Sequence, residues 1–240
     1  MASIEAHGLS KRYGARNALD GLTFAAEPGE VIGLLGPNGA GKTTTIRVLT
    51  TILEPSSGTF TVDGIPGDQP HRIRQRIGVL PESAGYPGGQ TGAEYLVYAA
   101  RLFGSSRREA RAVAERSLDE VGLADRAGAR ISTYSRGMKQ RLGIARALIN
   151  DPTVVFLDEP TLGLDPAGQR EILAGIREIG RGATVVLSTH ILTEVEQVCS
   201  RVLILDHGKL RAAGRLEEVI AGAGSLSDAF LSLTEEGGRD

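Results

Sequence analysis

The sequence predicts an α/β protein with a mostly parallel sheet, an N-terminal antiparallel β region and an inserted α-helical region. Three observations lead to this fold class: four short apolar runs rich in β-branched residues, helical patterns between them, and a long helix-forming stretch that contains no buried-strand run. The 240 residues are 41% hydrophobic and 23% charged, with a formal net charge of -2. This composition excludes a disordered chain and argues against a protein that binds nucleic acid through a basic face.

Length and cysteine content set further bounds. The length suggests one large domain or two small ones. The single cysteine, Cys199, permits no intramolecular disulfide, so a reducing compartment fits best. No apolar run approaches the ~18 residues that cross a bilayer, and the N-terminal residues lack the apolar segment of a secretory signal. We therefore expect a soluble, cytoplasmic protein.

The N-terminal part of the chain predicts an antiparallel sheet, at about residues 1–30 and 58–65. Its expected strands are joined by glycine and aspartate turns and cover Ile4–Tyr13, Leu19–Ala25 and Thr59–Val62.

The four apolar runs predict the strands of the core. None of them alternates polar with apolar residues, and such continuous runs are typical of strands buried on both faces by helices. They are Val31–Leu35, Thr153–Leu157, Thr184–Ser188 and Val202–Asp206.

Helical patterns separate these strands, which completes the α/β alternation. We expect helices at Lys42–Leu53, Arg136–Ile149 and Pro166–Ile179. A helical insertion is expected at about 83–150, within one domain that spans 1–225. Residues 226–240 are expected to be a short C-terminal tail with a small docking helix and a loose end.

A glycine-rich loop follows the first core strand and opens a helix. It matches the phosphate-binding pattern G-x-x-x-x-G-K-[ST] in the structural context that this motif requires. Glycines allow successive backbone N–H groups to turn inward, and the positive end of the helix dipole adds to the same point. Lysine reaches the β- and γ-phosphates, and the threonine hydroxyl ligates Mg²⁺. We therefore predict a P-loop NTPase core, with a nucleoside-triphosphate site at Gly36, Pro37, Asn38, Gly39, Ala40, Gly41, Lys42, Thr43 and Thr44.

Two carboxylates end the second core strand. Asp158 and Glu159 follow the run Thr153–Leu157, and ligands of open α/β sheets bind at the carboxyl ends of strands. We expect both side chains to face the phosphate loop, with Asp158 in the Mg²⁺ shell and Glu159 polarising the attacking water as general base.

Three further segments fix a family resemblance. They are Tyr134–Leu142 (YSRGMKQRL) before the acidic strand, Thr161–Pro166 (TLGLDP) after it, and Ser188–His190 (STH) at the end of the next strand. Across nearly all of its length the chain resembles the nucleotide-binding domain of ATP-binding cassette (ABC) transporters. The forms of its motifs are most similar to the cytosolic ATPases of ABC-2-type exporters.

The resemblance implies roles for residues outside the phosphate loop. Tyr13 would stack on adenine, and His190 would contact the γ-phosphate and help to position the water. Ser135 and Gly137 would begin a helix that points at the γ-phosphate held by a second copy, and Asp165 would organise the interface between the two copies.

The chain departs from the family pattern at two motifs. The usual Leu-Ser-Gly-Gly-Gln carries Tyr134, Arg136 and Met138 instead, although the serine and the second glycine are retained. The motif that leads into the helical insertion carries Glu82 where a glutamine is usual. Glu82 can still ligate the metal through oxygen, but it adds a negative charge near the γ-phosphate.

The resemblance also implies partners. ATP and Mg²⁺ would be bound, two cassettes (identical or paralogous) would dimerise on ATP, and a separate transmembrane permease would hold the protein at the cytoplasmic face of the membrane. The permease would dock near Glu82–Phe103, where four aromatic residues concentrate, although this cluster is equally compatible with a small core of the insertion. A soluble ABC-type ATPase with a non-transport role is the main alternative, and a non-catalytic nucleotide-binding regulator is a second. The transported cargo is not encoded in any motif.

Overall fold

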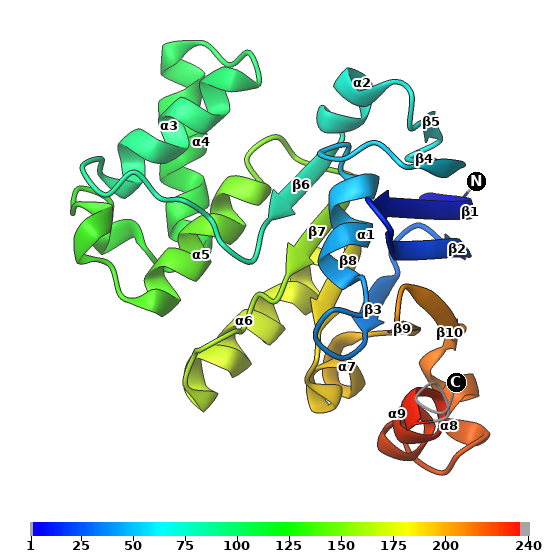
Figure 1. Ribbon diagram of the computed structural model, residues 1–240. Coiled ribbons are helices and arrows are strands. Elements are labelled where there is room, and N and C mark those ends of the chain that lie inside the picture. The colour runs from blue at the N-terminus through cyan, green and yellow to red at the C-terminus, as the bar shows by residue number, and fades with distance from the viewer. Residues whose placement is uncertain (1, 236–240) are drawn as a thin grey trace.

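A six-stranded sheet forms the centre of the structure, a computed structural model that describes residues 2–235 (Figure 1). Its strand order is β10-β9-β3-β8-β7-β6, and all neighbouring strands are parallel except the pair of β9 and β10. The predicted α/β class with a mostly parallel sheet is confirmed. The strands are β3 (Val31–Leu35), β6 (Ile77–Leu80), β7 (Val154–Asp158), β8 (Thr184–Thr189), β9 (Arg201–Asp206) and β10 (Lys209–Arg215).

The parallel strands β3, β7, β8 and β9 are buried on both faces, which explains why they do not alternate polar with apolar residues. On β3, Ile32 and Leu34 belong to one hydrophobic cluster, which includes residues of α1 (Lys42–Leu49). Val31 and Leu35 belong to a second cluster, which includes residues of α6 (Pro166–Ile179) and α7 (Leu192–Val198).

The N-terminal region forms the predicted antiparallel sheet, with strand order β2-β1-β4-β5. Residues of its buried face join the same cluster as α1, so this sheet packs over one side of the core. Its strands are β1 (Ile4–Tyr13), β2 (Arg16–Ala26), β4 (Ser57–Val62) and β5 (Ile65–Pro66), followed by the short helix α2 (Pro70–Arg74).

The helices between β6 and β7 form a separate lobe (Figure 1) with its own hydrophobic cluster. Capping boxes begin two of its helices: Thr91 and Glu94 in α3, and Ser106 and Glu109 in α4. The lobe comprises α3 (Gly92–Leu102), α4 (Arg107–Glu120), the 3-10 turns η1 (Ala124–Arg126) and η2 (Ile131–Thr133), and α5 (Arg136–Ala147).

Two helices follow the sheet, α8 (Leu216–Ala221) and α9 (Leu226–Glu235). Leu226 and Ala229 of α9 are buried, and Leu226 joins the cluster of α6 and α7. This position agrees with the docking helix expected in the predicted tail 226–240, of which residues 236–240 lie outside the described residues. Among residues 2–235, no helix combines the length and the apolar character needed to cross a membrane.

The structure differs from the sequence analysis at several elements: strand β10 was not predicted, the helix expected at Arg136–Ile149 ends at Ala147, and two further differences lie near the phosphate loop and Glu82. The helix predicted at Lys42–Leu53 ends at Leu49, because Thr51 adopts a left-handed conformation with φ 61°. Strand β6 was not predicted: its four residues are too short a run to be distinguished from a loop by pattern alone. This strand delivers the chain to Glu82.

A substitution at Gly78 tests how closely β6 must approach α5. A Cβ atom at Gly78 would collide with the carbonyl oxygen of Ala147, which is backbone and cannot move aside independently. We expect Gly78→Ala to lower the free energy of unfolding by about 2 kcal/mol or more, as overpacked sites do, in urea denaturation. Gly85→Ala is the matched control, since its Cβ would meet open space. Equal stability of the two variants would contradict this close approach.

Candidate functional site

The phosphate loop connects β3 to α1, as predicted. Gly39 and Gly41 have φ values of 82° and 112°, a region that glycine enters without steric cost. A Cβ atom at Gly41 would also lie 2.7 Å from the carbonyl oxygen of Ala18. The Lys42 ammonium folds back over the loop and donates to the carbonyl oxygens of Gly36 at 2.7 Å and Pro37 at 3.3 Å.

The two carboxylates at the end of β7 lie beside this loop. Asp158 Oδ1 accepts hydrogen bonds from Ser188 Oγ at 2.5 Å and from Thr43 Oγ1 at 3.3 Å. Glu159 lies 3.8 Å from Lys42 Nζ and 3.0 Å from His190 Nδ1, measured from its carboxylate oxygens. Glu159 has φ 49°, a left-handed conformation that is rare for a residue with a side chain and occurs often at functional sites.

Opposite charges are therefore buried together at the strand end. Lys42, Asp158 and Glu159 are all buried side chains. Burial of the ammonium lowers the pKa of Lys42, and the negative charges of Glu159, Asp158 and Glu82 oppose that shift. Each of these ionised groups depends on its neighbours for compensation in a setting with little water.

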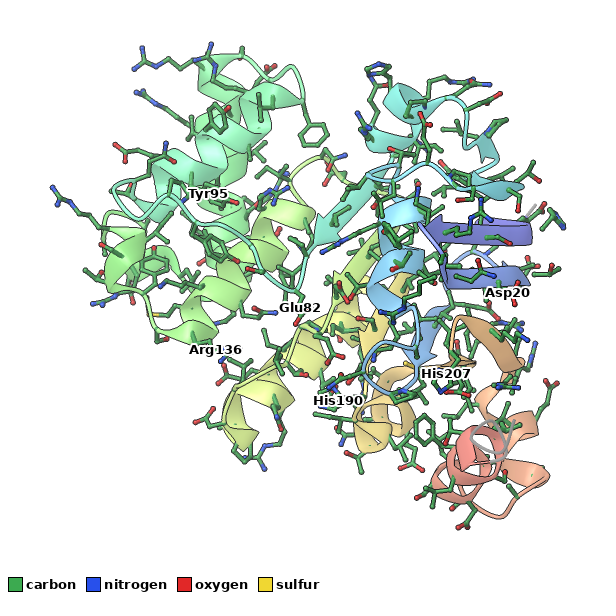
Figure 2. The ribbon with its side chains drawn as sticks, in the orientation of Figure 1. Asp20, Glu82, Tyr95, Arg136, His190 and His207 are labelled. Atoms are coloured by element: carbon green, nitrogen blue, oxygen red, sulfur yellow. The ribbon has the colours of Figure 1, made fainter. Side chains whose placement is uncertain are left out.

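A hollow of about 650 Å³ opens over these residues. Tyr13, 46% exposed at the end of β1, lines it together with Lys42, Thr43, Glu159 and His190. Glu82 also lines the hollow, and Figure 2 shows it at the junction between the helical lobe and the core. The structure thus brings the predicted adenine, phosphate, metal and base residues to one place.

The oxygen donors of this hollow fit a hard divalent cation. The Thr43 hydroxyl bonds directly to the Asp158 carboxylate, and Glu82 contributes a further carboxylate to the wall. Mg²⁺ prefers oxygen ligands and is usually held by one or two carboxylates together with substrate phosphates. These oxygen-bearing side chains are of the type that Mg²⁺ takes, and within residues 2–235 no group of three or more His, Cys, Asp or Glu side chains forms a metal site by itself.

The remaining predicted residues lie elsewhere. Ser135, Gly137 and Asp165 line a second hollow of about 390 Å³, and the two sets of lining residues do not overlap. Ser135 is the N-cap of α5 and accepts from the Met138 N–H at 3.2 Å, and Asp165 is the N-cap of α6 and accepts from the Gly168 N–H at 2.9 Å. Within one chain, Ser135 and Gly137 therefore do not line the hollow over the phosphate loop, whereas Arg136 shares a smaller hollow with Glu82 and Glu159.

Ser188 and Arg16 are among the residues of the site that were not predicted. Ser188 donates to Asp158 and also accepts from the Glu159 N–H at 3.0 Å, so it holds both acidic residues. Arg16 lines the first hollow from β2, where it is paired with Tyr13 across the hairpin. The motif Ser188-Thr189-His190 drew attention to the strand end, but the role of Ser188 depends on its register opposite Asp158.

Comparisons with known proteins agree with this geometry. A family model described as ABC transporter matches residues 19–162. The chain is 42% identical to Nod factor export ATP-binding protein I of Paraburkholderia xenovorans (strain LB400), over 92% of this chain and 73% of that protein. It is also 42% identical to the daunorubicin/doxorubicin resistance ATP-binding protein DrrA of Streptomyces peucetius, over 93% of this chain and 68% of that protein.

Solved structures show the same fold. The structure of an ATP-binding subunit of an ABC transporter has a TM-score of 0.85 at 34% identity, over 96% of this chain and 98% of that one. A dimeric ATP-binding cassette in a post-hydrolysis state, bound to ADP and Pi, has a TM-score of 0.81 at 24% identity, over 88% of this chain and 98% of that one.

Removal of the Ser188 hydroxyl tests its hold on the buried carboxylate. We expect Ser188→Ala to lower the free energy of unfolding by about 1–3 kcal/mol, because buried Asp158 loses its shortest hydrogen bond. Urea denaturation measures the change. Ser200→Ala is a control, since that exposed hydroxyl makes a long bond of 3.4 Å to the Val31 carbonyl oxygen. A Ser188→Ala variant as stable as the parent protein would refute this role.

Proposed function

The chain belongs to the ABC transporter family, and we propose that it is the ATP-binding and hydrolysing subunit of an exporter that works with a separate permease. The observation that carries this proposal is the joint presence of the phosphate loop, Glu159 and His190 in one hollow, with Asp158 bonded to Thr43 of its wall. Export is supported by the relatives, whose names describe Nod factor export and drug resistance.

The phosphate loop and its neighbours bind the nucleotide. Backbone N–H groups at the loop and the start of α1 attract the phosphates, with Lys42 as a point charge and Tyr13 as the stacking partner of adenine. Thr43, Asp158 and Glu82 would hold Mg²⁺. When bound, this ion neutralises charge that develops on the phosphate oxygens.

Glu159 and His190 are the residues that we assign to the hydrolysis step. In this proposal Glu159 accepts a proton from the water that attacks the γ-phosphorus, and ADP and phosphate are released. His190 Nδ1 donates to the Glu159 carboxylate at 3.0 Å and keeps it directed into the hollow. Most of the reduction of the barrier comes from positioning and electrostatics, as in other phosphoryl transfers.

A second cassette completes each site. Because Ser135 and Gly137 are not part of the hollow of their own chain, they are available to the γ-phosphate held by another copy. The N-terminus of α5 would supply its dipole to that anion. ATP would then join the two copies, and loss of the γ-phosphate would release them.

The permease docks on the helical lobe. The four aromatic residues of this region fall into two pairs. Tyr86 packs edge-on against Tyr95, with their ring centroids 5.9 Å apart. Tyr98 and Phe103 are instead 57% and 47% exposed. Leu102, 69% exposed, adds to the outer part of α3. These exposed apolar side chains support a docking surface for cytoplasmic loops of a membrane subunit, which would hold the protein at the cytoplasmic face of the membrane.

Glu159→Gln tests the proposed function. The amide cannot accept the proton of water, so turnover of ATP should fall about 100-fold or more while the nucleotide still binds. We expect the variant to form an ATP-dependent dimer in size-exclusion chromatography. Lys42→Ala is the comparison, because loss of its charge should abolish turnover and weaken nucleotide binding as well. Turnover of Glu159→Gln at the parent rate would overturn the base assignment, and a monomer with ATP would overturn the shared site.

Glu82→Gln tests the metal assignment at the departure from the family motif. The glutamine oxygen can still ligate Mg²⁺ while the negative charge near the γ-phosphate is removed, so turnover should be preserved or raised. Glu82→Ala removes the oxygen and should lower turnover and raise the Mg²⁺ concentration required for half-maximal rate. Complete loss of turnover in Glu82→Gln would instead show that a carboxylate is required.

A further inference from the structure

Glu194, a buried carboxylate on α7, has no part in the steps above. It is 3% exposed. Its Oε2 accepts a hydrogen bond from Thr189 Oγ1 at 2.7 Å, whereas Oε1 has no hydrogen-bond partner among the described residues. A buried carboxylate with so few donors is costly in comparison with an apolar side chain. Packing alone therefore does not explain its presence.

The hydrogen bonds of Glu194 close the turn that carries His190. Thr189 Oγ1 donates to Glu194 and accepts from the Ile191 N–H at 3.1 Å. The Glu194 N–H donates to the Ile191 carbonyl oxygen at 3.2 Å. Glu194 thus contacts the residues on both sides of His190, through its side chain on one and its backbone on the other.

The chemistry of this link requires an oxygen acceptor at position 194. A hydroxyl has a single proton, and donation of that proton to Glu194 leaves the lone pairs of Thr189 Oγ1 directed at the Ile191 N–H. An apolar side chain at 194 would leave the hydroxyl free to rotate. A glutamine carbonyl oxygen would restore the acceptor without the charge.

Helix α7 packs closely against strand β3 of the sheet. A Cβ atom at Gly33 of β3 would lie 2.9 Å from Val195 Cγ1 and 3.1 Å from Cys199 Sγ, so helix and strand are in close contact there. The His190 imidazole is itself exposed, and within residues 2–235 its hydrogen bonds go to Glu159. The backbone of the turn therefore determines where the ring meets the Glu159 carboxylate.

We propose that Glu194 is a positioning residue: through Thr189 it fixes the turn that holds His190 against Glu159. This inference rests on the proposed function, since it assigns to Glu194 the orientation of the pair that acts on water. Nucleotide binding uses the phosphate loop between β3 and α1, whereas the rate of hydrolysis depends on Glu159 and His190. A change at Glu194 should therefore affect the rate and not the binding.

Steady-state ATP turnover of the purified full chain tests the proposal. We expect Glu194→Ala to lower kcat about 10-fold while KM for ATP stays within about 2-fold, because loss of an orienting contact affects the reacting geometry more than binding. Glu194→Gln should restore kcat to within about 3-fold of the parent chain. Thr189→Val removes the linking hydroxyl and should resemble Glu194→Ala, and the double variant should lose no more than either single one.

Glu196→Ala on the same helix is the matched control, because that side chain is exposed, and it should retain the parent kcat and KM. Thermal unfolding of every variant is measured in parallel. A parent-like kcat in both Glu194→Ala and Thr189→Val would overturn the proposal, as would additive losses in the double variant. If Glu194→Ala does not fold, a large loss of kcat in the stable Glu194→Gln variant with a parent-like Thr189→Val would also overturn it. The proposed function is judged separately in the same assay, by turnover of the parent chain and its loss in Glu159→Gln.

Discussion

The structure depends on the burial of one ammonium beside two carboxylates at the carboxyl edge of the sheet. Lys42 begins α1, whereas Asp158 and Glu159 stand at the end of β7, and with Glu82 they form a group of one basic and three acidic side chains. A triphosphate is itself strongly anionic. Beside these carboxylates its charge needs compensation, which backbone N–H groups and the dipole of α1 supply in part and which the proposed divalent cation would complete. This charge balance is the physical reason why the proposed function places Mg²⁺ beside the phosphate loop.

The core could be predicted because each of its long strands is buried on both faces. A continuous apolar run such as Val31–Leu35 is typical of a strand buried on both faces, and the observed strand has the predicted bounds. Strand β6 could not be found in the same way. It is short, contains Gly78, and is stabilised by pairing with β7 and by close contact with Ala147, which are distant in sequence. Helix α1 likewise ends before its predicted end because Thr51 has a left-handed backbone conformation. A threonine gives no indication of such a conformation in the sequence.

The chemical residues were easier to predict than the residues that support them. The pattern of the phosphate loop predicted Lys42 and Thr43, and the position after a buried strand predicted Asp158 and Glu159; the structure places these residues side by side. The hold of Ser188 on that pair depends on the register of β7 and β8, which places Asp158 opposite Ser188. Sequence patterns do not specify register between strands so far apart. The assignment of Ser135, Gly137 and Asp165 to an interface remains a prediction, since in a single chain two of them act as helix caps.

The end of β8 supports the carboxylate pair from two directions. Successive side chains of a strand point to opposite faces, and here Ser188 bonds to Asp158 and the Glu159 N–H while Thr189 bonds to Glu194. The next residue, His190, contacts the Glu159 carboxylate. Three consecutive residues therefore hold Asp158, the turn and Glu159, which are the metal carboxylate and the base of the proposed function only. Because Glu159 adopts a left-handed backbone that needs support from its surroundings, the rigidity of β8 and α7 is a requirement of the site as well as of the fold.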